Sequence, residues 1–202
     1  FYRPNVLSAV GAVLLLCDIY VMKRFNILIL VMFAATAVVW SQGAAVNWLS
    51  VEELEVAQAK EPRKVMIDVY TKWCGPCKMM MRNTFTNADV IEYINSNFYA
   101  VKFDAEGPDA VEFRGQTYSN PTYVPNKTGR NGVHELSRAL QVRAYPTLVY
   151  LNEDLEMIAP ISGYKNPQQL ELYLRFFNDA WVPGTAQEEW DAFQASFTPT
   201  FE

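Results

Sequence analysis

Short, nearly continuous apolar segments recur along residues 46–180. Four of them have the length of strands, at 65–70, 98–103, 145–151 and 157–161. Apolar runs of this length, bounded by turn residues, are typical of strands buried on both faces. The polar stretch "NED" joins the last two segments as a hairpin. Pro160 favours an edge position for the second of them, because proline cannot donate a ladder hydrogen bond.

Helix signals separate these segments, at 50–59, after Cys77, from Thr86 or Asn87, at 133–140 and from Asn166. Ser50 and Glu53 have the spacing of a capping box. Asn166 is followed by Pro167, and the residues beyond them repeat apolar positions at helical spacing. The order of strands and helices predicts an α/β fold, with a central mixed β-sheet flanked by helices.

Residues 107–130 follow neither pattern and are rich in Gly, Pro, Asn, Tyr and Thr. Within them, "FRGQTY" and "PTYVPN" are candidates for the two strands of a hairpin. So long an irregular connection is usually functional or an embellishment of the core. We therefore expect a domain at 46–180 with an insertion at about 105–132.

Residues 181–202 form an additional tail. Thr185 and Glu188 have capping spacing, and Trp190, Phe193 and Phe197 form a short apolar stripe. This pattern predicts an amphipathic helix. We favour a lid that packs back on the domain over a helix that docks on a partner.

Residues 1–45 have the pattern of an export signal or a membrane anchor. Two apolar runs flank "MKR", and "SQGAA" follows the second run. A basic start, an apolar stretch and then small residues are typical of a secretory signal peptide, with Met22 as the natural start and residues 1–21 upstream of it. The alternative is that both runs are membrane segments. We expect a periplasmic or secreted protein, or one that is anchored in the membrane and faces the periplasm.

Composition narrows the function classes. A net charge of −5 argues against the basic face that a nucleic-acid-binding protein needs. His134 is the single histidine, so the chain has too few histidines for a histidine-rich metal site and only one that could serve in a Ser/His/Asp triad. The third cysteine, Cys17, lies in the apolar N-terminus, which leaves Cys74 and Cys77 to be explained as a pair.

Cys74 and Cys77 have the spacing of a redox pair at the start of a helix. A structural zinc site needs four ligands, which the chain does not supply, so we expect no metal and no other cofactor. The first sulfur of such a pair lies near free helix N–H groups and the positive end of the helix dipole, which favours its thiolate. Cys74 is therefore the predicted nucleophile. Cys77, one turn further and more buried, is predicted to resolve the mixed disulfide.

The motif "WCGPCK" after the strand "VMIDVY" resembles thioredoxin, and the resemblance covers about residues 49–177. It implies a thioredoxin-like fold. It also implies that Asp68, six residues before Cys74, is a buried acid that moves protons for Cys77, with Lys102 as its partner. The alternatives are an Asp68 bonded to backbone and a Lys102 in solvent.

The resemblance also implies a substrate-binding face beside the disulfide. Pro146 in "YPT" matches the cis-proline whose neighbouring backbone pairs with substrate, and Gly163 matches a glycine that lets a partner approach. Trp73 is expected to cover the reactive thiol. The residues of this face are Trp73, Gly75, Pro76, Tyr145, Pro146 and Gly163.

The chain also departs from thioredoxin. Arg82 stands where thioredoxins commonly have a proline, and "RNTFTNADV" is similar to exported thioredoxin-like domains that relay electrons in the periplasm. Tyr145 is bulkier than the residue often found before the cis-proline. The insertion leads into the cis-proline loop, and it either overhangs the active-site face or lies apart from it. We expect Met79, Met80 and Met81 to fill the core.

These features predict an exported thiol–disulfide oxidoreductase that reduces or isomerises protein disulfides through Cys74 and Cys77. Its partners would be disulfide-containing proteins and a membrane or periplasmic electron donor, with possible attachment to the membrane through the N-terminus. The alternative is a redox-inactive, chaperone-like module that binds clients through the cis-proline groove and the insertion.

Overall fold

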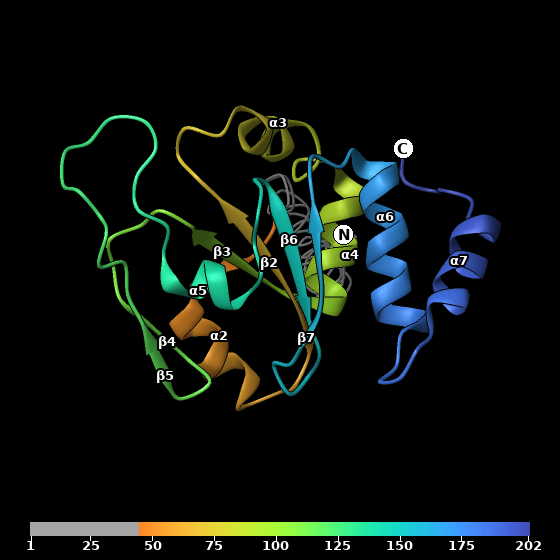
Figure 1. Cartoon of the computed structure of the whole chain (residues 1–202). Coiled ribbons are helices and arrows are strands. Elements are labelled where there is room, and N and C mark those ends of the chain that lie inside the picture. The colour runs from red at the N-terminus through yellow and green to blue at the C-terminus, as the bar shows by residue number, and fades with distance from the viewer. Residues whose placement is uncertain (1–44) are drawn as a thin grey trace, which may run out of the picture. The chain divides into compact units, whose positions relative to one another are not determined.

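A computed structural model describes residues 45–202 of the chain, and its centre is a five-stranded mixed sheet (Figure 1). The strands lie in the order β1-β3-β2-β6-β7. Both β1 and β2 run parallel to β3, whereas β6 is antiparallel to β2 and β7 is antiparallel to β6. Their bounds are β1 Trp48–Leu49, β2 Lys64–Tyr70, β3 Phe98–Asp104, β6 Thr147–Leu151 and β7 Met157–Ser162. The predicted mixed sheet is confirmed, and only β1 was missed, because two residues carry no periodicity.

Three helices, α2, α4 and α6, begin where the capping residues predict them. A capping box between Ser50 and Glu53 begins α2, and Asn166 begins α6 with Pro167 in its first turn. Asn87 rather than Thr86 caps α4, since the Thr86 hydroxyl donates to a backbone carbonyl of the preceding helix. The bounds are α2 Val51–Gln58, α3 Gly75–Asn83, α4 Ala88–Asn97, α5 Glu135–Ala139, α6 Pro167–Arg175, the π-helical turn η1 Phe176–Ala180 and α7 Gln187–Ser196.

Alternate residues of β2 face two separate cores, because successive strand side chains point to opposite faces. Met66 packs in the core that includes α4 and α6, whereas Val65, Ile67 and Val69 pack in the core that includes α2 and α5. Figure 1 shows these two groups of helices on opposite sides of the sheet. By this alternation Asp68 shares the face of Met66.

The two edges of the sheet are β1 and β7. Pro160 lies in β7, opposite Val149 of β6, so the predicted edge position of this proline is confirmed. The other edge, β1, has two residues.

The insertion contains a small hairpin, but not the predicted one. Its strands are β4 (Val111–Phe113) and β5 (Gln116–Tyr118). The chain reverses at Arg114 and Gly115, whose φ angles are 54° and 71°. The segment "FRGQTY" therefore spans the turn instead of forming one strand. "PTYVPN" forms no strand, since its two prolines cannot donate ladder hydrogen bonds.

The tail packs on α6 and η1 through aromatic rings. Trp190 of α7 stacks on Tyr173 with the ring centroids 5.4 Å apart, and it meets Phe176 edge to face at 4.8 Å. The predicted cap at Thr185 is wrong: Ala186 begins α7, and the Thr185 hydroxyl donates to the carbonyl of Val182 instead.

Glu171 of α6 holds the last residues of the tail. This fully buried carboxylate accepts backbone hydrogen bonds from Thr200 at 2.7 Å and Phe201 at 2.9 Å. Arg175 pairs with it at 2.9 Å. Phe201 is buried as a result and belongs to the core around α4 and α6.

The N-terminal predictions for residues 1–44, including Met22 as the start, lie outside the described residues. Among residues 45–202, no helix combines the length and the apolar character needed to cross a membrane.

Candidate functional site

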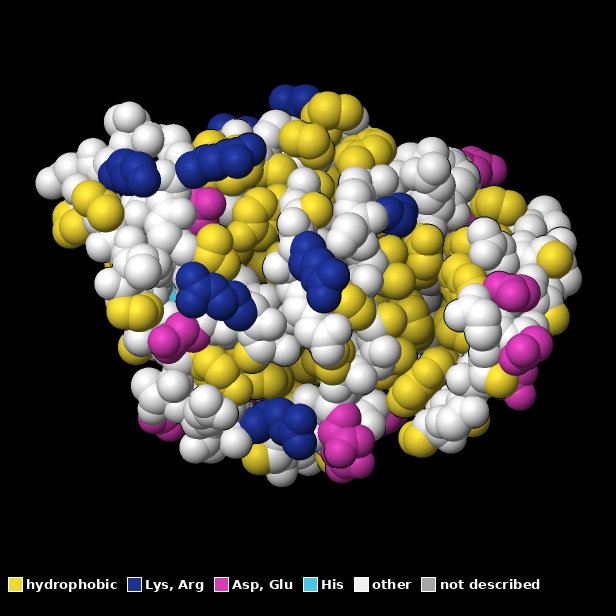
Figure 2. All heavy atoms as spheres, viewed as in Figure 1, with side chains coloured by type: hydrophobic (Ala, Val, Ile, Leu, Met, Phe, Trp, Pro, Cys, Tyr) yellow, Lys and Arg dark blue, Asp and Glu magenta, His cyan; other side chains and the backbone are white. Residues whose placement is uncertain are grey.

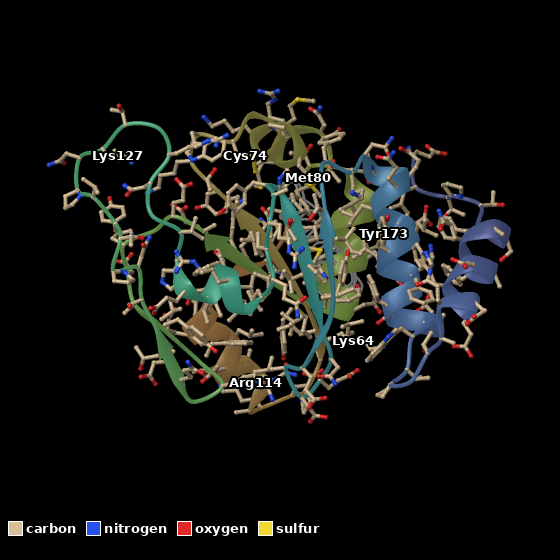
Figure 3. The ribbon with its side chains drawn as sticks, viewed as in Figure 1. Lys64, Cys74, Met80, Arg114, Lys127 and Tyr173 are labelled. Atoms are coloured by element: carbon tan, nitrogen blue, oxygen red, sulfur yellow. A yellow bond between two sulfur atoms is a disulfide. The ribbon has the colours of Figure 1, made fainter. Side chains whose placement is uncertain are left out.

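Cys74 and Cys77 form a disulfide at the N-terminal end of α3 (Figure 3). Cys74 is the N-cap residue of this helix, and its Sγ accepts the backbone N–H of Cys77 at 3.1 Å. Pro76 occupies the first turn, where the missing N–H costs no helical hydrogen bond. The N-terminus of a helix stabilises a thiolate at this position, so Cys74 meets the requirement for a nucleophile.

The expectation that Cys77 is the more buried cysteine is wrong for the disulfide form. Cys74 is 2% exposed and Cys77 is 4% exposed. Both cysteines are buried almost completely in this form. A partner can therefore reach the Cys74 sulfur only past the residues that cover it, so these residues affect access to the disulfide.

Asp68 and Lys102 are brought together by strand register. They are paired residues of the parallel strands β2 and β3, and Lys102 Nζ lies 3.3 Å from Asp68 Oδ2. The side chain of Asp68 is 3% exposed and that of Lys102 is 25% exposed. Burial raises the pKa of the Asp68 carboxyl above its ordinary value, and the charge of Lys102 offsets only part of this effect. Asp68 can therefore hold a proton at a higher pH than an exposed aspartate.

Lys102 also borders the same hollow as Cys77. This hollow of about 230 Å³ is lined by Tyr70, Thr71, Lys72, Cys77, Lys78, Met81 and Lys102. The ammonium of Lys102 lies 4.9 Å from the ring centroids of both Trp48 and Tyr70. The position of Trp48 beside Lys102 was not predicted, because Trp48 lies on strand β1, whose two residues are too few to reveal it. The arrangement places Lys102, which is paired with Asp68, at the hollow that Cys77 also borders.

The peptide bond between Tyr145 and Pro146 is cis, as predicted. The carbonyl of Pro146 accepts the backbone N–H of Gly163 at 2.8 Å, which ties the end of β7 to this loop. Gly163 has a φ of 89°, a conformation that favours glycine. Burial, together with the charges of Glu106 and Asp104, raises the pKa of Tyr145, so its hydroxyl stays neutral.

Trp73 connects the disulfide to the insertion. Its indole Nε1 donates to Oε2 of Glu106 at 2.8 Å, and its ring meets Tyr145 edge to face with centroids 6.0 Å apart. The guanidinium of Arg130 lies 4.8 Å from the centroid of the Trp73 indole. Of the two alternatives for the insertion, the structure shows that it contacts the active-site face.

Glu106 and Arg130 are functional candidates that the sequence did not reveal. Both lie in irregular segments, where no periodicity predicts which residues meet. Gly75 and Pro76 are exposed at the start of α3, as a substrate-binding face requires. The expected core role of the three methionines is partly wrong: Met80 is 1% exposed, Met81 packs against the core and Met79 is 42% exposed. A helix cannot bury three successive residues on one face.

Residues 45–202 contain no group of three or more His, Cys, Asp or Glu side chains that could hold a metal ion. The reactive groups of the site are the Cys74–Cys77 disulfide, the buried carboxyl of Asp68 and the ammonium of Lys102, together with the groups around the Trp73 indole.

Comparison with known proteins identifies relatives of this chain. The chain is 32% identical over 92 residues to a thioredoxin-like protein of Synechocystis, covering 41% of this chain and 81% of that protein. It is 24% identical over 151 residues to the thiol:disulfide interchange protein DsbD of Pectobacterium atrosepticum, covering 72% of this chain and 22% of that protein.

A solved structure supports the same fold. The thioredoxin-fold protein from Helicobacter pylori superposes with a TM-score of 0.52 at 16% identity, covering 78% of this chain and 88% of that one. The family model of the thioredoxin-like domain matches residues 51–178, which include β2, the disulfide and the cis-proline. The chain therefore belongs to the thioredoxin-like domain family, with a Cys74–Cys77 pair at its redox position.

Proposed function

We propose that this protein is an exported thiol–disulfide oxidoreductase that reduces or isomerises disulfides in other proteins. The observation that supports this function most directly is the Cys74–Cys77 disulfide at the start of α3, next to a hollow that also contains Lys102. A dithiol that closes into a disulfide is the group that a two-electron exchange needs.

The first step is an attack by the Cys74 thiolate on a substrate disulfide. A bond forms between Cys74 Sγ and one substrate sulfur, while the substrate S–S bond breaks and its second sulfur leaves as a thiolate. The helix N-terminus stabilises the attacking thiolate. The backbone of the substrate would align along the cis Tyr145–Pro146 peptide, whose Tyr145 ring contacts Trp73 and whose Pro146 carbonyl bonds Gly163.

The second step releases the substrate. The Cys77 thiol loses its proton to the ionised carboxylate of Asp68, and its sulfur attacks Cys74 Sγ. The mixed disulfide breaks, the Cys74–Cys77 disulfide forms, and the first substrate sulfur leaves as a thiolate. Two electrons have then passed to the substrate. Lys102 moderates the proton affinity of Asp68 through their 3.3 Å contact.

The reduced form must then be regenerated by a dithiol donor, in the membrane or in the periplasm. A reducing direction is favoured by the Gly75–Pro76 pair between the cysteines, which is the thioredoxin type with a potential of about −270 mV. Export is supported by the "MKR" and the following apolar run, which have the order of a signal peptide. The name of the Pectobacterium relative, an interchange protein, agrees with disulfide exchange as the activity.

The experiment that tests this function is a measurement of the reduction potential of the Cys74–Cys77 pair in the purified protein, by equilibration against glutathione and dithiothreitol series. We expect a reversible two-electron transition near −270 mV. A value near −120 mV would make the protein a disulfide donor instead. A double Cys74→Ser, Cys77→Ser variant is the control, since it can show no transition. Absence of any transition in the wild type would contradict the redox function and favour the client-binding module.

A further inference from the structure

The part of the insertion at residues 120–132, here called the insertion loop, is held in one shape by two asparagine side chains. Asn120, which is buried, donates from Nδ2 to the carbonyls of Gly107 and Gly132 at 3.0 and 2.7 Å. Asn131 exchanges two hydrogen bonds with the backbone of Val124, at 2.8 and 2.9 Å. Side-chain amides thus hydrogen-bond across both the base and the tip of the insertion loop. The loop therefore has a defined conformation.

One carboxylate fixes this loop to the redox site. Glu106 is 9% exposed, and its Oε2 accepts both the indole N–H of Trp73 and the backbone N–H of Asn131, at 2.8 and 2.7 Å. Arg130 lies against the Trp73 ring on the exposed side of the same contact. The loop therefore keeps a fixed position beside the residue that precedes Cys74.

A hollow of about 320 Å³ lies between the loop and the redox site. This volume is at the small end of the range for ligand pockets, about 300–1,000 Å³. Its lining residues are Lys72, Trp73, Asp104, Glu106, Tyr123, Lys127, Thr128, Gly129 and Asn131. The hollow is thus built jointly by the redox motif, the end of β3 and the insertion loop.

The exposed charges of this hollow are positive. The Lys72 side chain is 79% exposed and its Nζ pairs with Asp104 Oδ2 at 3.5 Å, whereas Lys127 is exposed without an ion pair among residues 45–202. The two carboxylates lie deeper and are already bonded: Glu106 as described, and Asp104 to the backbone N–H of Glu106 at 3.1 Å. Figure 2 shows several Lys and Arg side chains over α3 and the insertion, with others spread over the rest of this face, and Figure 3 labels Lys127 in the insertion.

We propose that this hollow is a subsite for an acidic side chain of the substrate protein, close to the disulfide that is exchanged. This proposal rests on the proposed function. A chain with a net charge of −5 repels acidic partners unless it presents a local positive surface at the point of contact. Lys127 supplies the positive charge that no carboxylate among residues 45–202 already pairs, Lys72 borders the same hollow, and the bond network of Glu106 keeps this surface beside Trp73.

The test uses two peptides with the same internal disulfide, one flanked by Asp and Glu and the other by Asn and Gln. The full-length protein, reduced beforehand, is mixed with each peptide, and the ratio of the acidic to the neutral rate is measured at low salt. We expect a ratio above one that falls about two- to fivefold in Lys127→Gln, the size expected for one exposed charge contact. Lys127→Glu should lower it further, and added salt should reduce the wild-type ratio.

Lys60→Gln is the matched control, because Lys60 is exposed just beyond α2, far from α3 in Figure 1, and the change removes the same charge. Its ratio should equal that of the wild type. If the ratio of the acidic-peptide rate to the neutral-peptide rate is the same in the wild type and in Lys127→Glu, the subsite is overturned. Reduction of the neutral peptide at a measurable rate would in that case still support the redox function. A wild-type protein that reduces neither peptide would overturn the proposed function and the subsite with it.

Discussion

The indole N–H of Trp73 and the backbone N–H of Asn131 share one carboxylate oxygen of Glu106, at 2.8 and 2.7 Å. Trp73 precedes Cys74 and Asn131 belongs to the insertion. A single buried acceptor therefore joins the segment that carries the disulfide to the insertion. Removing it should loosen the loop without removing either cysteine.

Replacing Glu106 with alanine should release the insertion loop. The Asn131 amide would lose its acceptor, and its hydrogen exchange should become about tenfold to a hundredfold faster, since a hydrogen bond to a charged group contributes about 1.5–3 kcal/mol. The measurement is residue-resolved amide exchange by NMR. Glu112→Ala is the control, because Glu112 is an exposed residue of β4 whose carboxylate bonds only Thr117 among residues 45–202. Unchanged protection at Asn131 would contradict the role given to Glu106.

Replacing Cys77 with serine should trap the substrate. Cys74 can still attack, but no thiol remains to release the mixed disulfide, so the protein should gain the mass of one substrate molecule. Intact mass spectrometry after mixing the reduced variant with a disulfide peptide measures this. Cys74→Ser is the matched control and should trap much less. Equal trapping by both variants would show that the two cysteines do not have separate roles.

Replacing Asp68 with asparagine should change both stability and rate. Because burial raises the pKa of Asp68, the folded protein retains a proton that the unfolded chain has lost at pH values between the ordinary 3.8 and the raised value. The free energy of unfolding of the oxidised wild type therefore falls as pH rises through this window, by up to about 1.4 kcal/mol per pH unit. The variant should lack this fall, and its turnover should be about a hundredfold slower.

Urea unfolding across pH and steady-state turnover test this prediction. Asp154→Asn is the control, since Asp154 is an exposed aspartate of the turn between β6 and β7. If Asp68→Asn and the wild type show the same pH dependence of stability, then Asp68 does not titrate differently in the folded state.

Replacing Glu171 with glutamine should weaken the hold on the tail. Burial alone would raise the pKa of Glu171, but hydrogen bonds from Thr200, Phe201 and Arg175 outweigh it and lower the pKa below 4.5. The stability that this carboxylate contributes is therefore present above pH 4.5 and is lost as pH falls through the lowered pKa. We expect a loss of about 1–3 kcal/mol at pH 7, which shrinks in acid.

Chemical unfolding and limited proteolysis of residues 181–202 measure this effect. Glu188→Gln, on the exposed face of α7, changes the same charge and should have no effect. A tail that is cleaved equally fast in the wild type and in Glu171→Gln would show that Glu171 does not hold it.

The redox centre could be predicted because its parts are fixed locally or by strand register. Cys74 and Cys77 need only one helix start, and Asp68 meets Lys102 because the strands that carry them are neighbours in the sheet. The cis bond before Pro146 follows from a short motif.

The surroundings of that centre could not be predicted in the same way. The bond from Trp73 to Glu106 joins residues in two irregular segments, where neither helical nor strand periodicity applies. The hairpin was misplaced for a related reason. Arg114 adopts a left-handed conformation that residues other than glycine rarely take, so Gly115 was the only turn signal in this segment, and the segment was assigned to one strand.

Pro160 also affects how whole molecules meet. A sheet edge with free N–H groups can recruit a strand from another chain and so begin aggregation. Pro160 removes a donor from the middle of β7, and β1 offers only two residues at the opposite edge. Within residues 45–202, neither edge of the sheet presents a long uninterrupted row of donors, so the fold discourages self-assembly through strand addition.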